Sequence, residues 1–107
     1  MGKYHNKKAV IDGIRFDSKK EANYYTYLKI LRDSGKIWNL ELQKKFVLQD
    51  KFTLNGKTYR AINYIADFVY EDDNGMHVVD TKGYRTEVYK IKKKMFAYKY
   101  QIEIEEI

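Results

Sequence analysis

Two aspartates in the C-terminal half of the sequence are spaced for metal-assisted chemistry. Asp67 interrupts the apolar segment Tyr64-Ile65-Ala66-Asp67-Phe68, and Asp80 lies within Val78-Val79-Asp80-Thr81-Lys82-Gly83. Because strand side chains alternate between faces, Asp80 and Lys82 are expected on the same side of a strand. Carboxylate oxygens bind hard cations such as Mg²⁺, and a neighbouring ammonium group can stabilise developing negative charge. These residue types therefore indicate a site that acts on an anionic group.

A turn between the two segments would bring the aspartates together. The acidic stretch Glu71-Asp72-Asp73-Asn74-Gly75 contains an Asn-Gly step, which favours a hairpin or a slightly longer loop. We predict strands over 62–70 and 77–82 on either side of it. The fold-back would place Asp67 near Asp80.

Glu21 is a third candidate acid. It lies in the first turn of a predicted helix, and at about 100° per residue it falls within that helix's apolar stripe. This stripe consists of Tyr24, Tyr25, Leu28 and Leu31. An ionised group there needs a partner, which the two aspartates and a bound cation would supply. Alternatively, Glu21 is a capping-box residue whose carboxylate accepts from the backbone N–H of Ser18.

The elements that would position these acids follow from local patterns. Asp12-Gly13 predicts a hairpin over 8–16. Ser18 is a predicted N-cap for a helix over 22–33, with Gly35 as its stop. The alternation over 37–49 predicts a strand with Trp38, Leu40 and Leu42 on one side and a bend near Lys44-Lys45.

The remaining segments complete an α/β order. Asn55-Gly56 predicts a second hairpin over 52–62. A helix is predicted over 86–97, capped by Thr86, and a last strand over 98–107. The apolar side of this second helix is predicted to carry Val88, Ile91 and Met95. The order is helix, three strands, helix and strand, preceded by a small hairpin.

The length of 107 residues predicts a single domain over 1–107, with an N-terminal hairpin arm over 1–16 and a core over 17–107. The sequence has no Cys, which excludes disulfides and thiolate chemistry. No apolar run is long enough to span a bilayer, and no secretory leader is recognisable. We therefore expect an intracellular, cytoplasmic protein without a membrane partner.

The formal net charge of +6 and the 11 tyrosines favour a polyanionic partner such as nucleic acid. Lys90, Lys93 and Lys94 form a basic side of the second helix and are candidate phosphate contacts; a solvated charged face is the competing interpretation. Tyr84 and Arg85 lie next to the acid-x-Lys segment and are further candidate contacts.

The set Glu21, Asp67 and Asp80-Thr81-Lys82 resembles the motif of the PD-(D/E)XK nuclease superfamily, with a helix acid, a strand acid and an acid-x-Lys strand. Ala66 stands where that motif usually has Pro. The segments around Asp67 and Asp80 are similar to phage endonucleases that resolve Holliday junctions. Beyond this core, the segments 16–22 and 86–90 resemble a family of small uncharacterised phage and prophage proteins described as endonucleases.

This resemblance implies a restriction-endonuclease-like α/β core, in which two helices flank a central mixed sheet of about four strands. It also implies an Mg²⁺-dependent DNA endonuclease, with Mn²⁺ able to substitute. Asp67 and Asp80 would bind the metal, together with the Thr81 carbonyl and with Glu21 directly or through water. Lys82 would be catalytic, and Gln43 lies where such nucleases often carry a polar active-site residue.

The expected substrate is branched DNA, such as a Holliday junction in phage recombination or replication, within the host-cell cytoplasm if the protein is phage-encoded. A homodimer would supply the two symmetric cuts that a four-way junction requires. Two alternatives remain open at this point: a nuclease of the same superfamily that is not selective for DNA structure, and a non-catalytic nucleic-acid-binding protein. DNA-binding residues would include Arg85, Lys90, Lys93 and Lys94.

Overall fold

The computed structural model describes residues 8–81 and 84–107, and it has the α/β architecture expected from the sequence. A central four-stranded sheet has the order β3-β6-β7-β8. The strands β3 (Trp38–Gln49), β6 (Ile62–Asp72) and β7 (Gly75–Asp80) are antiparallel, whereas β8 (Ile104–Glu106) pairs parallel to β7. The sheet is therefore mixed, and the segment between β7 and β8 is a helical crossover.

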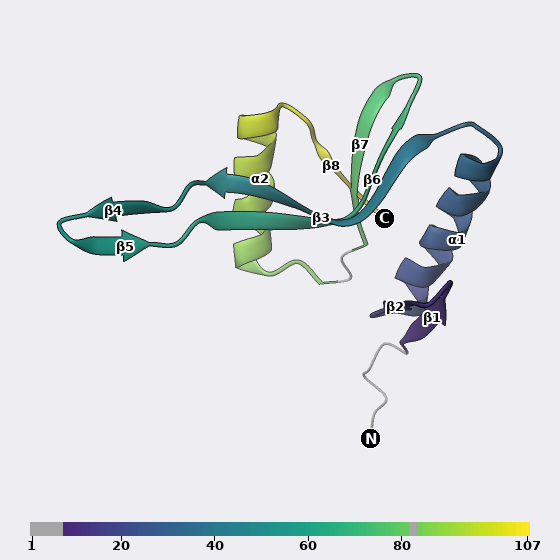
Figure 1. Cartoon of the computed structure of the whole chain (residues 1–107), viewed down its shortest axis with the longest axis horizontal. Helices are drawn as coiled ribbons and strands as arrows, with labels where there is room; N and C mark the ends of the chain where they lie inside the picture. Colours follow the sequence, from purple (N-terminus) through teal and green to yellow (C-terminus); the bar gives the residue numbers. More distant parts are fainter. Residues whose placement is uncertain (1–7, 82–83) are drawn as a thin grey trace.

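Two helices flank this sheet (Figure 1). The first, α1 (Lys19–Asp33), follows a hairpin of β1 (Ala9–Ile11) and β2 (Ile14–Phe16), and the second, α2 (Glu87–Tyr100), lies between β7 and β8. The predicted N-terminal hairpin over 8–16 is thus confirmed for the described residues. A separate hairpin of β4 (Phe52–Leu54) and β5 (Lys57–Tyr59) joins β3 to β6.

The start of α1 forms as the capping pattern predicts. The Ser18 hydroxyl accepts from the Glu21 backbone N–H at 3.1 Å, which satisfies one of the free donors at the helix start. The helix buries Ala22, Tyr25 and Leu28, and it ends at Ser34 before Gly35, whose φ is +78°. Glu21 lies in this buried stripe, with only 7 % of its surface exposed.

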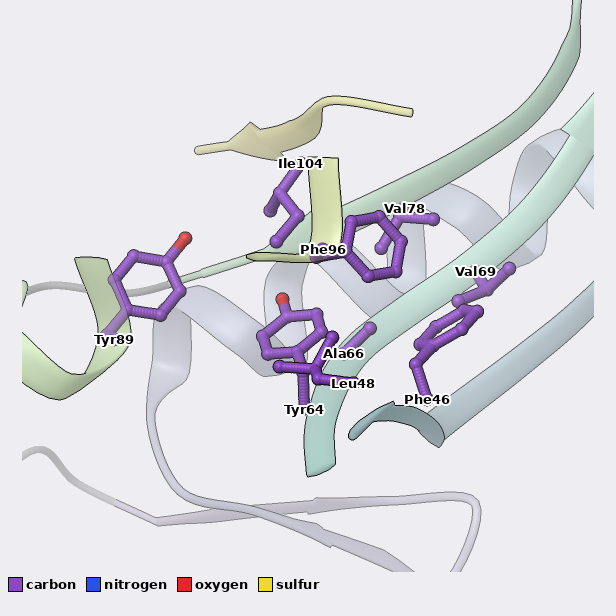
Figure 2. Close-up of a cluster of buried hydrophobic side chains, with 9 residues drawn as sticks. All are labelled: Phe46, Leu48, Tyr64, Ala66, Val69, Val78, Tyr89, Phe96 and Ile104. Carbon is purple, nitrogen blue, oxygen red and sulfur yellow. The ribbon is translucent and has the colours of Figure 1, made fainter. Parts of the chain in front are cut away.

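Each helix covers its own hydrophobic cluster. Under α1, Tyr25 and Leu28 pack with Phe68, Tyr70 and Val79. The cluster under α2 is shown in Figure 2. It consists of Phe46, Leu48, Tyr64, Ala66, Val69, Val78, Tyr89, Phe96 and Ile104.

The alternation of side chains inverts in the middle of the sheet. In β6, Tyr64 and Ala66 belong to the α2 cluster, but Phe68 belongs to the α1 cluster. In β3, Leu42 packs with the α1 cluster and Phe46 with the α2 cluster. A regular strand would keep residues two apart on one face. Both strands therefore change sides between the cross-strand pairs 42–68 and 44–66.

The sequence predicts a bend near Lys44-Lys45, and the irregular residue of β3 lies directly before this pair. Gln43 carries the irregularity, with a left-handed φ of +53°. The register with β6 is kept across Gln43 and shifts between Trp38 and Glu41, where Asn39 also has a positive φ, and again between Val47 and Gln49. Trp38, which was predicted on the same side as Leu40 and Leu42, is 41 % exposed, whereas the two leucines pack against the α1 cluster.

The turn between β6 and β7 is tighter than predicted, because pairing continues to Asp72 and Gly75. The Asn74 backbone N–H donates to the Asp72 carboxylate at 2.8 Å, which closes this turn. The strand predicted over 77–82 accordingly begins at Gly75 and ends at Asp80. Lys82 and Gly83 lie outside the described residues, as does the segment 1–7.

Two predictions about α2 are wrong. The helix continues through Tyr100 instead of ending at Ala97, because Tyr100 packs against Phe46 and Phe96 and the left-handed Gln101 then ends it. The last strand is therefore only Ile104–Glu106.

The buried side of α2 is also one position away from the predicted stripe. Tyr89 and Phe96 are buried, whereas Val88 is 61 % and Ile91 is 58 % exposed. Residues 89 and 96 are seven apart and therefore share a helical face. Their large aromatic rings fill the space above the sheet, which the smaller side chains of the predicted stripe would leave open. Met95 packs at the margin of the cluster.

His77 on β7 contacts an acid on each of the two neighbouring strands, β6 and β8. Its ring stacks on Tyr70 at a centroid distance of 4.9 Å and forms ion pairs with Asp72 and Glu105. Burial lowers the pKa of His77, but the hydrogen bonds with Glu105 and Asp72 outweigh this effect and raise the pKa above its usual value.

We expect His77 to make stability depend on pH. A histidine whose pKa is raised on folding stabilises the protein below the unfolded value of 6.5, and this contribution is lost as the pH rises through the folded pKa. Urea unfolding of the wild type and of His77→Gln should therefore give a difference in the free energy of unfolding that is larger at pH 5.5 than at pH 8.5. These values lie about one unit below and two units above the unfolded histidine pKa of 6.5. An equal difference at both pH values would contradict this role.

Candidate active site

Four separate elements bring polar side chains together where β3 and β6 change sides. Glu21 comes from the first turn of α1, Gln43 from β3, Asp67 from β6, and Thr81 follows β7. Gln43 and Asp67 lie between the paired residues 42–68 and 44–66. The irregular backbone at Gln43 is thus part of the site, as is common where strained conformations are held by surrounding structure.

The Gln43 amide bridges two carboxylates. Its Nε2 donates to Glu21 Oε2 at 3.1 Å and to Asp67 Oδ1 at 3.2 Å. One neutral donor group therefore lies between two acids that are far apart in the sequence. Gln43 is exposed whereas Glu21 is buried, so the site opens to solvent on the β3 side.

Thr81 fixes the other oxygen of Asp67. The Thr81 backbone N–H donates to Asp67 Oδ2 at 2.8 Å, and its hydroxyl donates to the same oxygen at 2.7 Å. The sequence predicted a role only for the Thr81 carbonyl and missed these two donors. A Thr placed one residue after a strand acid was the available signal, because its hydroxyl can reach a neighbouring strand.

The environment of Glu21 disfavours its ionised form. Burial raises the pKa of Glu21, and the charge of Asp67 raises it further. A backbone hydrogen bond at Asp17 acts in the opposite direction, while the charges of Asp17 and Asp80 add smaller upward effects. A raised carboxyl pKa caused by burial and like charge is typical of functional sites.

Asp80 lies at the edge of this group and faces the α2 side of the sheet. It is 1 % exposed, and its Oδ2 accepts from the Tyr64 hydroxyl at 2.7 Å. Burial and this hydrogen bond raise the pKa of Tyr64 well above its usual value, so the hydroxyl stays a donor. The sequence analysis missed Tyr64; its signal was a strand aspartate among apolar residues, which requires a donor on the same face.

The described acids do not form a complete metal cage. Within residues 8–81 and 84–107, no group of three or more His, Asp or Glu side chains is arranged to hold a metal ion. Glu21 and Asp67 share Gln43, whereas Asp80 is directed to Tyr64. Lys82, the predicted catalytic base or electrostatic group, lies outside the described residues.

Three of the four predicted DNA-contacting cations have acidic neighbours. Arg85 and Lys93 both pair with Glu106, at 3.3 and 3.1 Å, and Lys90 pairs with Glu87 at 3.1 Å. Lys94 lies on the exposed surface of α2. The Tyr89 hydroxyl also donates to Glu106, and this hydrogen bond together with Lys93 lowers the pKa of that carboxyl.

A comparison with family models places the whole site within one match. The matching model is described as a protein of unknown function (DUF1064), and it covers residues 1–105. The chain belongs to this family. All four elements of the site in this DUF1064 protein fall inside the matched range.

Comparisons of the DUF1064 chain with curated proteins and with solved structures found no significant match. Neither helix in the described part of the DUF1064 chain is long and apolar enough to cross a membrane.

Proposed function

We propose that this protein is an Mg²⁺-dependent endonuclease that hydrolyses phosphodiester bonds in DNA, with branched DNA such as a Holliday junction as its substrate. The observation that carries the proposal is the bridge from Glu21 through the Gln43 amide to Asp67. Burial and the neighbouring charge of Asp67 both disfavour the ionised form of the Glu21 carboxylate, so this arrangement opposes folding when both acids are charged. A bound cation would relieve both effects.

The chemistry of the available donors fits Mg²⁺, which prefers carboxylate, carbonyl and water oxygens. Asp67 and Asp80, the Thr81 carbonyl and Glu21, directly or through water, would hold the ion, and Mn²⁺ would substitute. When bound, the ion would activate water and neutralise charge on the phosphoryl group.

Neighbouring side chains would hold the carboxylates of Glu21 and Asp67 in the orientation needed to bind the ion. Gln43 fixes the relative orientation of Glu21 and Asp67, and the two donors of Thr81 hold the second oxygen of Asp67. We assign Lys82 the remaining role, which is to orient or deprotonate the water or to stabilise the anionic transition state.

DNA as the polyanion is supported by the net charge of +6 and by exposed cations on α2. Arg85, Lys90, Lys93 and Lys94 are the proposed phosphate contacts, for which DNA would compete with Glu87 and Glu106. A homodimer would present two active sites related by a two-fold axis, as symmetric resolution of a four-way junction requires.

Cleavage of a labelled four-way junction in Mg²⁺ tests the proposal. We expect paired cuts near the branch, no cleavage in EDTA, and much slower cleavage of a linear duplex of the same sequence. Comparable cutting of junction and linear duplex would support the alternative of a structure-nonselective nuclease. No metal-dependent cleavage of junction, flap, nicked or linear DNA would refute the enzymatic proposal.

A second candidate, a non-catalytic nucleic-acid-binding protein, is favoured by one observation. The buried Asp80 carboxylate accepts from the Tyr64 hydroxyl at 2.7 Å, which gives this acid a structural partner. In that case Asp80→Asn and Lys82→Ala would leave every activity unchanged, whereas Lys93→Ala and Lys94→Ala would weaken DNA binding. The nuclease proposal requires the first two variants to lose cleavage while retaining DNA binding.

A further inference from the structure

The β4–β5 hairpin, together with its flanking residues 50–61, forms an arm that projects from the central sheet. Figure 1 shows it extending beyond the ends of β3 and β6. Its strands pair as a separate two-stranded sheet, and every residue from 50 to 60 is exposed. Asn55 and Gly56 both have positive φ values, of 50° and 78°, which gives the tight turn that such hairpins favour.

One face of the arm is apolar and aromatic. The register pairs Phe52 with Tyr59 and Leu54 with Lys57, so these four side chains share a face. The rings of Phe52 and Tyr59 stack at 4.8 Å with an interplanar angle of 8°. Lys57 Nζ lies 5.1 Å from the centre of the Tyr59 ring.

An isolated two-stranded hairpin is only marginally stable in water, and a projecting apolar face is an interaction surface. The arm's charges indicate what it contacts. Lys51, Lys57 and Arg60 are basic, and Asp50 is the one acidic residue in 50–61. A basic, aromatic ribbon is complementary to a polyanion, and the three cations of the arm outnumber its one carboxylate.

We propose that the arm is a DNA-binding element that enters a groove of duplex DNA next to the cleavage site. The major groove is about 12 Å wide and admits a two-stranded β-ribbon. Lys51, Lys57 and Arg60 contact phosphates along the groove, and the face carrying Phe52 and Tyr59 lies against the groove surface. The inference rests on the proposed function only in taking DNA as the partner.

The geometry places this contact on one flank of the proposed site. Phe52 follows Gln43 by nine residues, and strands rise roughly 3.3 Å per residue, so the arm begins up to about 30 Å from the site. At about 3.4 Å per base pair this distance corresponds to roughly nine base pairs, slightly less than one turn of the duplex. The arm therefore binds duplex that the acidic site itself does not reach.

The pairing of Gln49 with Ile62 allows a clean test. Residues 50–61 can be replaced by Asn-Gly, which joins these paired residues by a two-residue turn and leaves the acidic site unchanged. Binding of a fluorescein-labelled linear duplex of about three helical turns, roughly 30 base pairs, is measured by anisotropy in EDTA across a salt series. EDTA separates binding from cleavage.

We expect the shortened protein to bind this duplex at least about 10-fold more weakly, with a salt slope lower by about 2 to 3, since three cations are removed at about 0.9 each. Lys57→Ala should lower the slope by about 1, whereas the matched control Lys36→Ala, an exposed residue after α1, should leave it unchanged. Lys57→Ala also tests the proposal if the shortened chain does not fold.

Unchanged affinity and salt slope in both arm variants would overturn the inference. A second outcome would also overturn it: the shortened protein sediments as a monomer where the full chain is a dimer, while the duplex affinity per protomer stays the same. The arm would then be a contact between copies of the chain. Arm-dependent binding by a protein that never cleaves DNA would support the arm and refute the nuclease. Metal-dependent cleavage together with unchanged DNA binding by the arm variants would support the nuclease proposal and refute the proposed role of the arm.

Discussion

Glu21→Gln is expected to yield a protein that is more stable at neutral pH and at least about 100-fold slower in Mg²⁺-dependent cleavage. The loss of rate follows from removing a charged oxygen donor, because metal-assisted charge stabilisation contributes several kcal/mol and each 1.4 kcal/mol is about tenfold in rate. The new amide oxygen can still accept from Gln43 Nε2, so the local hydrogen bond is kept.

The stability gain has a defined pH dependence. The pKa of Glu21 is raised by burial and by Asp67, so the folded protein keeps the proton at pH values where the unfolded chain has lost it. Stability therefore falls as the pH rises from the usual glutamate value of 4.5 through the raised pKa. The advantage of Glu21→Gln should be absent below pH 4.5 and complete above the raised pKa.

Urea unfolding at pH 4 and pH 8, on either side of the usual glutamate value of 4.5, measures the effect on stability, and single-turnover junction cleavage measures the effect on rate. Glu103→Gln is the matched control, because Glu103 is exposed and lies outside the site. If Glu21→Gln destabilised the protein at pH 8, Glu21 would be a structural capping residue. Full cleavage activity in a more stable variant would remove Glu21 from the active site.

Phe96→Ala is expected to destabilise the protein by about 3–5 kcal/mol, a large part of the 5–15 kcal/mol typical of a domain. Phe96 is fully buried, and its ring lies 4.9 Å from Phe46 and 5.6 Å from Tyr64. Truncation leaves a cavity among aromatic rings that cannot all move to fill it. It also removes one of the rings that pack against Tyr64, the hydrogen-bond donor to Asp80.

Ile91→Ala on the same helix is the matched control and should change stability by less than about 0.5 kcal/mol, because Ile91 is 58 % exposed. Urea unfolding of both variants, with the denaturant slope checked for constancy, gives the comparison. Similar losses in the two variants would mean that α2 packs through its aliphatic stripe instead of its aromatic side.

Local patterns in the sequence predicted most of the architecture. The Asp12-Gly13 and Asn55-Gly56 turns, the Ser18 cap and the α/β order all appear in the structure, because each depends on neighbouring residues. The side of α2 that is buried could not be predicted in this way. Val88 and Ile91 have the right spacing and polarity, and only the space above the sheet favours the larger rings of Tyr89 and Phe96.

The candidate site was predicted by residue type but not in its detailed contacts. Glu21 and Asp67 could be singled out because a carboxylate on an apolar helix stripe or within an apolar strand is conspicuous in a sequence. In the structure both acids contact Gln43. The direction of Asp80 toward Tyr64 depends on side-chain contacts across two strands. Perfect alternation would not have predicted the change of sides in β3 and β6, which coincides in β3 with the left-handed residue Gln43.

The distribution of the site over α1, β3, β6 and the end of β7 links ligand binding to folding. Glu21 and Asp67 approach one another only when the N-terminal helix has docked on the completed sheet. A cation shared by these carboxylates, as we propose, would bind the native chain and not the unfolded one, and its binding would add RT ln(1 + [L]/Kd) to the free energy of unfolding. The melting temperature would then report occupancy of the site directly, without any DNA present.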